Sequence, residues 1–173
     1  MKIVLIGYMG SGKSAVGKHL ASILKIDFKD LDNEIEADEK QSIAQIFSKK
    51  SEIYFRKREK ETLKTVIDTK NDFVLATGGG TPCYGDTMDL LLKDKEILII
   101  YLRTPIPVLT ERIFPKKSKR PLIAHIETKE DLNEFISKHI FERSQFYNRA
   151  SLTFNIENKT ISEIVAEIIL ELI

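Results

Sequence analysis

The chain has 173 residues, of which 42% are hydrophobic and 31% charged, and its 27 Lys and Arg balance 26 Asp and Glu to a net charge of +1. This length predicts one domain over residues 1–173, large enough to bury about 70% of the unfolded surface. The balanced charge argues against nucleic acid, the lack of a long apolar run argues against a membrane segment, and the single Cys83 cannot form an intrachain disulfide. We therefore expect a cytoplasmic protein that binds neither nucleic acid nor membrane.

The first predicted elements are an apolar strand at 2–6 and a helix at 13–24, joined by a glycine-rich loop. The loop sequence GYMGSGKS matches the phosphate-binding pattern G-x-x-x-x-G-K-[ST] in its expected strand-to-helix context. Glycines let backbone N–H groups face an anion at a helix N-terminus, where the helix dipole favours negative charge. We expect Lys13 to reach the β- and γ-phosphates and the Ser14 hydroxyl to bind Mg²⁺. A glycine-rich turn with an incidental Lys-Ser pair is the alternative, but the flanking elements favour nucleoside triphosphate binding.

The remaining elements alternate between strands and helices. Strands are predicted at 27–31, 73–76, 97–102 and 151–156, and helices near 33–39, 42–49, 52–69, 85–93, 105–113, 128–146 and 160–172. The last helix has a cap at Thr160 with Glu163 three residues later. This alternation predicts an α/β fold with about five parallel strands and helices on both faces of the sheet. Ligands in such sheets bind at the carboxyl ends of the strands, so the loops there should hold the site.

The second strand is expected to end in Asp30-Leu31-Asp32, with both carboxylates on one side of the strand. One could hold Mg²⁺ through water while the other accepts a proton or hydrogen-bonds a hydroxyl. A solvated acidic strand end is the alternative. The third strand ends in Thr77 rather than in the metal-binding Asp of many phosphate-loop proteins, which favours a function for Asp30 and Asp32.

Two further features indicate a site for an acceptor substrate. Gly78, Gly79 and Gly80 follow the third strand. Three consecutive glycines lose much backbone entropy on folding, which is understandable if a substrate contacts the main chain directly there; a flexible turn is the alternative. Arg56 follows Tyr54-Phe55, and a guanidinium at the edge of the core could hold a substrate carboxylate in a bidentate fork. The neighbouring charges are interpreted as a solvated helix face.

A basic segment with two prolines follows the fourth strand and its helix. We interpret residues 113–125 as a closing lid with Arg120 as its functional cation, because phosphoryl transfer needs water exclusion and positive charge. A solvated basic loop, or one that touches nucleic acid, is the alternative. Arg143 can share a helix stripe with Phe146 and Tyr147, although an ordinary cation near a helix C-terminus explains it equally well.

In this order and spacing, the segments resemble those of the shikimate kinases, a family of phosphate-loop small-molecule kinases. The similarity covers nearly the whole chain, in the segments GYMGSGKSAVG, FKDLDNEIE, QSIAQIF, EIYFRKRE, LATGGGTP, TER, KRPLI and ERSQFYNRA. It implies a three-layer fold with strand order 2-3-1-4-5 and a mobile lid. It also implies ATP- and Mg²⁺-dependent transfer of the γ-phosphate to the 3-hydroxyl of shikimate, giving shikimate 3-phosphate for aromatic amino acid biosynthesis. We expect a monomer whose partners are these small molecules.

The resemblance also implies residue roles. Catalytic roles fall to Lys13, Asp32 and Arg120, and ATP binding to Gly10, Ser11, Gly12, Lys13, Ser14, Ala15, Arg112, Arg120 and Asn155. Shikimate binding, with a segment at about 33–60, falls to Asp32, Arg56, Gly78, Gly79, Gly80 and Arg143. Ser14 and, through water, Asp30 would hold Mg²⁺, and Glu59 would position Arg56.

Three features depart from the family pattern: Ala15 replaces a frequent Thr, Ser51 replaces a usual Gly, and the segment Thr81-Pro82-Cys83 follows the glycines. Ser51 is expected only to make the turn before Glu52 less favourable than glycine would. The residues that follow the glycines leave the neighbouring wall of the pocket undefined.

Two other classes share some of these features. A gluconate or nucleoside-monophosphate kinase has the phosphate loop, the parallel sheet and the lid, but the set of Asp32, Arg56, the three glycines and Arg143 argues against both. A nucleotide-dependent switch without turnover should have a metal-binding Asp in place of Thr77 and no acceptor pocket. An ATP-dependent kinase is therefore the preferred interpretation.

Overall fold

The computed structural model describes residues 1–120 and 122–173; Pro121, which falls within the predicted lid, lies outside the described residues. One parallel sheet of five strands has the order β2-β3-β1-β4-β5, as predicted. The strands are β1 (Lys2–Ile6), β2 (Asp27–Asp30), β3 (Phe73–Ala76), β4 (Ile97–Arg103) and β5 (Leu152–Asn155). The central β1 pairs with β3 on one side and β4 on the other, so the loop that follows it leaves from the middle of the sheet.

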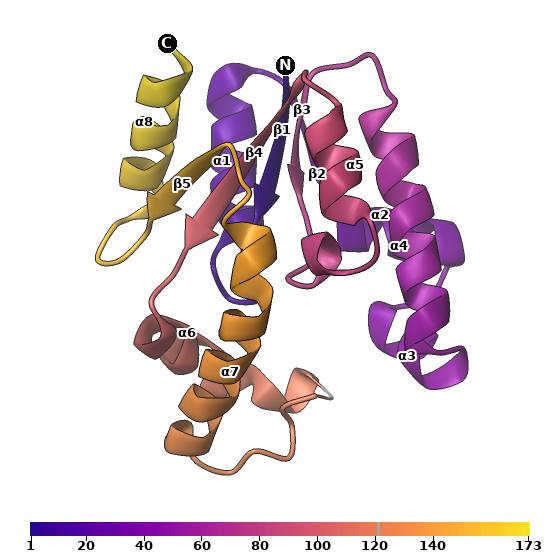
Figure 1. Cartoon of the computed structure of the whole chain (residues 1–173), viewed down its shortest axis with the longest axis vertical. Coiled ribbons are helices and arrows are strands. Elements are labelled where there is room, and N and C mark those ends of the chain that lie inside the picture. The colour runs from indigo at the N-terminus through magenta and orange to yellow at the C-terminus, as the bar shows by residue number, and fades with distance from the viewer. Residues whose placement is uncertain (121) are drawn as a thin grey trace.

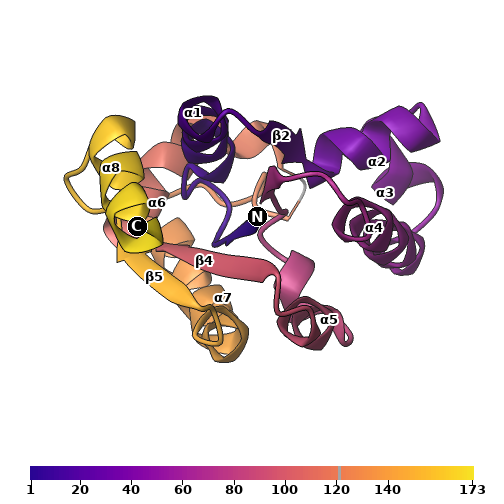
Figure 2. The ribbon, with the colours of Figure 1, turned by 90° about the horizontal axis from the view of Figure 1, so that it is seen from above.

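Helices cover both faces of this sheet (Figures 1 and 2). The α-helices are α1 (Lys13–Leu24), α2 (Leu31–Glu39), α3 (Ile43–Lys49), α4 (Glu52–Ile67), α5 (Thr87–Lys93), α6 (Ile106–Ile113), α7 (Lys129–Tyr147) and α8 (Ile161–Leu172). Two short 3-10 helices are η1 (Thr81–Cys83) and η2 (Phe114–Lys119). Viewed along the sheet, α1 and α8 lie on one face, α5 and α7 lie on the other, and α2 to α4 lie beyond β2 (Figure 2).

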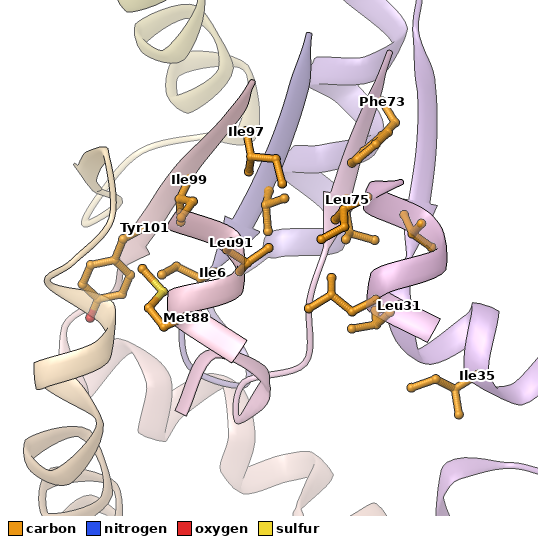
Figure 3. Packing of buried hydrophobic residues seen from close by; sticks show 14 of the residues in the cluster. Ile6, Leu31, Ile35, Phe73, Leu75, Met88, Leu91, Ile97, Ile99 and Tyr101 are labelled. Carbon is orange, nitrogen blue, oxygen red and sulfur yellow. The ribbon is translucent and has the colours of Figure 1, made fainter. Parts of the chain in front are cut away.

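The alternation of side chains along β1 builds a core on each face of the sheet. Ile3 and Leu5 pack in a cluster with α1 and α8, whereas Val4 and Ile6 belong to the cluster on the opposite face. Figure 3 shows Met88 and Leu91 of α5 among the side chains of this second cluster. A strand buried on both faces must be apolar at successive positions, which explains the continuous Ile-Val-Leu-Ile run of β1.

The predicted end of the second strand was wrong by one residue, and the error concerns the candidate site. β2 ends at Asp30, which is the N-cap of α2 and accepts a hydrogen bond of 3.2 Å from the backbone N–H of Asp32. Asp is a preferred N-cap residue because its side chain satisfies a helix N–H group that has no partner inside the helix. Asp32 therefore lies in the first turn of α2 rather than at the end of the strand.

Ser51 has a structural role that the sequence interpretation missed. Its backbone is extended, with φ of 168°, so the position does not require glycine. Its hydroxyl caps α4 by accepting the N–H of Tyr54 at 3.1 Å. The expected penalty on the turn is thus replaced by a favourable cap at the start of the helix that carries Arg56. At the other end of the chain, the predicted Thr160 and Glu163 capping box of α8 is confirmed.

A third hydrophobic cluster lies beyond the carboxyl ends of the strands, where α6 and the first part of α7 extend away from the sheet (Figure 1). Ile123 and Ile126 are buried there against Leu109 and Ile113 of α6 and against α7. This packing anchors the C-terminal part of the segment predicted as a lid. Among the described residues, no helix combines the length and the apolar character needed to span a bilayer.

Candidate active site

The loop between β1 and α1 has the backbone shape that its glycines predict. Gly10 and Gly12 have φ angles of 79° and 91°, which favour glycine strongly, and Gly12 directly precedes α1. A Cβ atom at Gly10 would also lie 3.0 Å from Cγ1 of Ile113, so α6 packs tightly against the loop. Ser11 is buried, whereas Ser14 and Ala15 lie exposed in the first turn of α1. Backbone N–H groups at this helix N-terminus can bind an anion.

Lys13 is buried within this loop and already bonded to it. Its ammonium donates to the carbonyl oxygens of Gly7 at 2.8 Å and Tyr8 at 2.9 Å. Burial lowers its pKa to about 8, against the raising effect of Asp32 and Asp30, while Arg120 and Arg143 lower it further. Lys13 therefore shares one electrostatic environment with two carboxylates and two guanidinium groups that come from three other segments of the chain.

Ser14 and Asp30 form an oxygen-rich pair suited to Mg²⁺. The Ser14 hydroxyl donates to Oδ2 of Asp30 at 2.6 Å. Mg²⁺ prefers hard oxygen ligands and is usually held by one or two carboxylates together with substrate phosphates and several waters. Within residues 1–120 and 122–173, no three His, Cys, Asp or Glu side chains gather around a common point. A hydroxyl and one carboxylate next to a phosphate loop nevertheless fit this mode of binding.

Asp32 lies at the start of α2 with its carboxylate beside the glycine triplet. Its Oδ1 atom is 3.5 Å from the position that a Cβ atom would take at Gly78. Burial raises the pKa of Asp32 to about 6, and the nearby Asp30 and Glu59 carboxylates add to the rise, whereas Lys13 opposes it. A carboxylate with a pKa near neutrality is well matched to accepting a proton from a hydroxyl.

The glycine triplet lies between the two arginines that were predicted to bind an anion. A Cβ atom at Gly80 would lie 2.8 Å from Nη2 of Arg56, and one at Gly79 would lie 3.6 Å from Nη1 of Arg143 and 2.9 Å from the backbone nitrogen of Met9. Any larger residue would therefore occupy the space beside both guanidinium groups. The close approach of the loop backbone to Gly79 also explains why glycine is needed there.

The two arginines come from α4 and α7, which are far apart in the sequence. Arg56 Nη1 bonds Oε2 of the buried Glu59 at 2.8 Å, so the predicted contact between these two residues is present. Arg143 is only 7% exposed, and its Cζ atom lies 5.6 Å from the centroid of the Tyr8 ring. An ordinary solvated cation would be exposed, so this burial argues against that alternative for Arg143.

The remaining predicted residues lie around the phosphate loop. Arg112 Nη1 donates to the carbonyl oxygen of Gly10 at 3.1 Å. Arg120 is half-buried and lies close to Lys13 and Tyr8. Burial is the main influence on both groups, lowering the pKa of Lys13 and raising that of Tyr8; the Arg120 charge adds to the first shift and opposes the second. Asn155 is exposed at the carboxyl end of the edge strand β5 and is not brought into the group formed by Lys13, Asp32 and the arginines.

Sequence reasoning missed several side chains that support the site. The hydroxyl of Tyr147 donates to the carbonyl oxygen of Gly79 at 2.6 Å, which ties the glycine triplet to α7. The buried Thr81 donates to Oε1 of Glu59 at 2.7 Å, and the Tyr84 ring lies over the Arg56 guanidinium. The unusual residues after the glycines were a signal, but no local pattern indicated which distant side chains they contact.

Comparisons with known proteins agree with this geometry. The family described as shikimate kinase matches residues 9–173. The chain is 44% identical to a shikimate kinase of Flavobacterium johnsoniae over 97% of its own length and 96% of that protein, and 40% identical to one of Flavobacterium psychrophilum over 96% of each.

Two solved structures are similar over almost the whole chain. A shikimate kinase from Bacteroides thetaiotaomicron has a TM-score of 0.88 and 31% identity, covering 99% of this chain and 98% of that one. A shikimate kinase from Acinetobacter baumannii in complex with shikimate has the same TM-score and identity, covering 99% and 92%.

Proposed function

The chain belongs to the shikimate kinase family, and from that premise we propose how its own residues bind ATP and shikimate and transfer the phosphoryl group between them. Kinases of this kind are ATP-dependent transferases of aromatic amino acid biosynthesis. The chemistry is a phosphoryl transfer, in which positioning and charge stabilisation supply most of the catalysis.

On the nucleotide side, the loop N–H groups of Gly10 to Ala15 hold the phosphates and Lys13 supplies charge to the β- and γ-phosphates. Ser14 and, through water, Asp30 would hold Mg²⁺, which would supply positive charge to the phosphates. The hydrogen bond between these two side chains supports this role. Arg112 and Asn155 border the adenine. Arg120 adds positive charge at the transferring phosphoryl group.

On the acceptor side, Arg56 and Arg143 bind the carboxylate of shikimate, and the backbone of Gly78, Gly79 and Gly80 contacts the rest of the molecule. Asp32 orients the 3-hydroxyl and accepts its proton. The hydroxyl oxygen then bonds to the γ-phosphorus, the bond to the β–γ bridging oxygen breaks, and ADP leaves. One observation carries this assignment: two guanidinium groups flank the glycine triplet while a carboxylate of raised pKa lies beside its first residue.

We further propose a single domain over residues 1–173, with an acceptor-binding segment at 33–60 and a lid at 113–125. The enzyme is proposed to act as a cytoplasmic monomer whose partners are ATP and shikimate, with no nucleic acid or membrane. A gluconate or nucleotide acceptor is the competing possibility. The buried Arg143 and the Arg56–Glu59 pair favour an acceptor with a carboxylate over a nucleotide. Gluconate also carries a carboxylate, so the activity panel below is what separates it from shikimate.

The test is a calorimetric titration of shikimate and of ATP with Arg56→Ala and Arg143→Ala. Removing one partner of a hydrogen-bonded charge pair costs about 2–5 kcal/mol, so shikimate affinity should fall about 30-fold or more while ATP affinity changes little. Lys57→Ala, an exposed cation beside Arg56 on α4, is the matched control and should bind both ligands normally. Equal losses for both ligands, or a loss for neither, would contradict the carboxylate clamp.

An activity panel separates the acceptor classes. Wild-type protein with ATP should turn over shikimate but not gluconate or nucleoside monophosphates. An amide in place of the shikimate carboxylate should bind the wild type weakly, and Arg56→Ala should not weaken it further. Preferential turnover of gluconate or of a nucleotide would overturn the assignment.

A further inference from the structure

The guanidinium group of Arg56 is held on one of its faces by an aromatic ring. Its Cζ atom lies 3.8 Å from the centroid of the Tyr84 ring and 5.1 Å from that of Phe55. A planar guanidinium stacks well on an aromatic face, and such contacts combine cation–π attraction with dispersion. Tyr84 itself remains 39% exposed, so its ring is not simply part of the hydrophobic core.

The edges of the same guanidinium are held by two other groups. Nη1 bonds Glu59 at 2.8 Å, and the backbone of Gly80 approaches Nη2 so closely that a Cβ atom there would lie 2.8 Å away. The Nε atom is buried and makes no hydrogen bond within residues 1–120 and 122–173, although it lies 3.5 Å from Oε1 of Glu52 in an ion pair. Arg56 is therefore fixed in orientation by an aromatic face, by the Glu59 carboxylate and by the backbone at Gly80.

Glu59 is in turn held by the segment that carries Tyr84. Thr81, which is 1% exposed, donates its hydroxyl to Oε1 of Glu59 at 2.7 Å. Thr81 and Tyr84 lie at the two ends of the four residues that follow the glycine triplet. These four residues thus reach Arg56 by two routes, one through Glu59 and one through the stacked ring.

We propose that residues 81–84 form a brace that sets the orientation of Arg56, with Tyr84 as its positioning residue, and thereby determines affinity for the carboxylate of the acceptor. This inference rests on the proposed role of Arg56 in binding that carboxylate. A long side chain loses rotamer freedom when it forms a bidentate contact, and a stack formed in advance lowers this cost. Tyr84 acts through Arg56, so it contributes to acceptor binding rather than to the chemical step.

The central experiment compares Tyr84→Leu with Tyr84→Phe by steady-state kinetics. Tyr84→Leu should raise the KM for shikimate about 3- to 10-fold, the size expected for a partly desolvated cation–π contact. The kcat and the KM for ATP should stay within about twofold, because neither depends on the orientation of Arg56. Tyr84→Phe keeps the ring and should restore the wild-type KM. Phe141→Leu, at an aromatic that is 82% exposed on α7, is the matched control and should change none of these constants.

A double-mutant cycle separates positioning from other roles. In an Arg56→Ala background, Tyr84→Leu should have no further effect on shikimate affinity measured by calorimetry, because the residue through which it acts is gone. Arg56→Lys keeps the charge but not the planar group, so Tyr84→Leu should have a smaller effect in that background than in the wild type. If Tyr84→Leu does not fold, Tyr84→Met provides the same test with a flexible apolar side chain.

The outcomes are distinguishable. An unchanged KM in Tyr84→Leu, a full effect that persists with Arg56→Ala, or equal losses for shikimate and ATP would each overturn the brace. An Arg56→Ala variant with normal shikimate affinity would instead overturn the proposed role of Arg56. Thr81→Val should weaken shikimate binding and Thr81→Ser should not, because only the serine keeps the hydroxyl that holds Glu59; the opposite result would remove that route from the proposal.

Discussion

The carboxyl group of Asp32 lies near two other carboxylates, Asp30 and Glu59, and in a partly dehydrated position. Burial is the larger cause of its raised pKa of about 6, and the two acidic neighbours add to it. The same surroundings that suit Asp32 to accept a proton also make its ionised form costly in the folded protein. The proposed role of Asp32 as proton acceptor and its contribution to stability therefore oppose each other.

Asp32→Asn should reduce kcat about 100-fold or more, because it removes the proton acceptor and keeps the shape. In the wild type, kcat/KM should fall as the pH drops through about 6, since protonated Asp32 cannot act as a base. The variant should lack that acidic limb. The measurement is a pH–rate profile from about pH 5 to 9 for both proteins. An intact kcat with only a raised KM would make Asp32 a binding residue.

Thermal unfolding provides the complementary measurement on the same variant. A carboxyl whose folded pKa is raised favours the folded state below its unfolded pKa of 3.8, and this contribution is lost as the pH rises through about 6. At pH 7 Asp32→Asn should thus raise the free energy of unfolding by about 1–3 kcal/mol. Asp27→Asn, at an exposed position on β2, is the control and should leave stability nearly unchanged.

Among the structural elements, η2 and the residues after it form the segment proposed as a lid. Its C-terminal part is fixed, because Ile123 and Ile126 pack against α6 and α7. Arg120 caps η2 through its backbone and lies within electrostatic range of Lys13. Any closing motion is therefore expected in η2 (Phe114–Lys119) and Arg120, with α6 and α7 as a stable base.

Arg120→Ala should lower kcat about 1,000-fold, as the loss of an arginine that stabilises a transferring phosphoryl group does. Shikimate affinity without nucleotide should change little, because Arg120 is proposed to act on the phosphoryl group. Hydrogen exchange across residues 113–125 should slow when ADP and shikimate are both bound. Normal turnover of the variant, or equal protection with and without ligands, would identify a static basic loop. Lys116→Ala, an exposed cation in η2, is the matched control.

Elements with strong periodicity could be predicted from the sequence, whereas the residues between them could not. The predicted bounds of β1 and β3 agree with the structure, and those of α8 differ by one residue at its start, because a buried strand and an amphipathic helix each leave a distinct apolar pattern. The short η1 and η2 were not predicted, since a single 3-10 turn has no such pattern. The boundary between β2 and α2 was misplaced because the capping role of Asp30 competed with its interpretation as a strand residue.

The candidate site divides in the same way. Lys13 could be identified from the phosphate-loop motif alone. The glycine triplet and Arg143 were selected through the resemblance to the shikimate kinases, because a flexible turn and an ordinary cation near a helix C-terminus remained open for them. The contacts of Thr81 with Glu59 and of Tyr84 with Arg56 could not, because they join segments more than 20 residues apart whose relative placement depends on how α4 packs against η1. The sequence, with the family resemblance, thus predicted most of the residues that meet, Asn155 being the exception, but not the contacts that hold them in place.

For the whole molecule, the proposed ATP and shikimate sites lie at one end of the sheet and should each stabilise the folded chain. A ligand at 100 times its Kd adds about 2.7 kcal/mol, which raises Tm by about 5–10 °C for a chain of this size. Lys13→Ala should abolish turnover and lose most of the shift caused by nucleotide, yet keep the shift caused by shikimate. Differential scanning calorimetry with each ligand is the measurement, and Lys18→Ala, exposed on the same helix, is the control. A Lys13→Ala variant with near wild-type kcat would contradict the assignment of the phosphate loop.

The central position of β1 has a consequence for how the chain is made. β1 is synthesised before the other four strands of this sheet, and its two partners, Phe73–Ala76 and Ile97–Arg103, follow much later. At about 5–20 residues per second the ribosome needs several seconds to proceed from β1 to the second of them. Until β3 emerges, this apolar segment, which is buried on both sides in the finished sheet, has no partner strand, and until β4 emerges it has at most one. The nascent chain should therefore be most vulnerable to aggregation before β4 has left the exit tunnel, and translation arrested in α5 should yield a product that depends on chaperones.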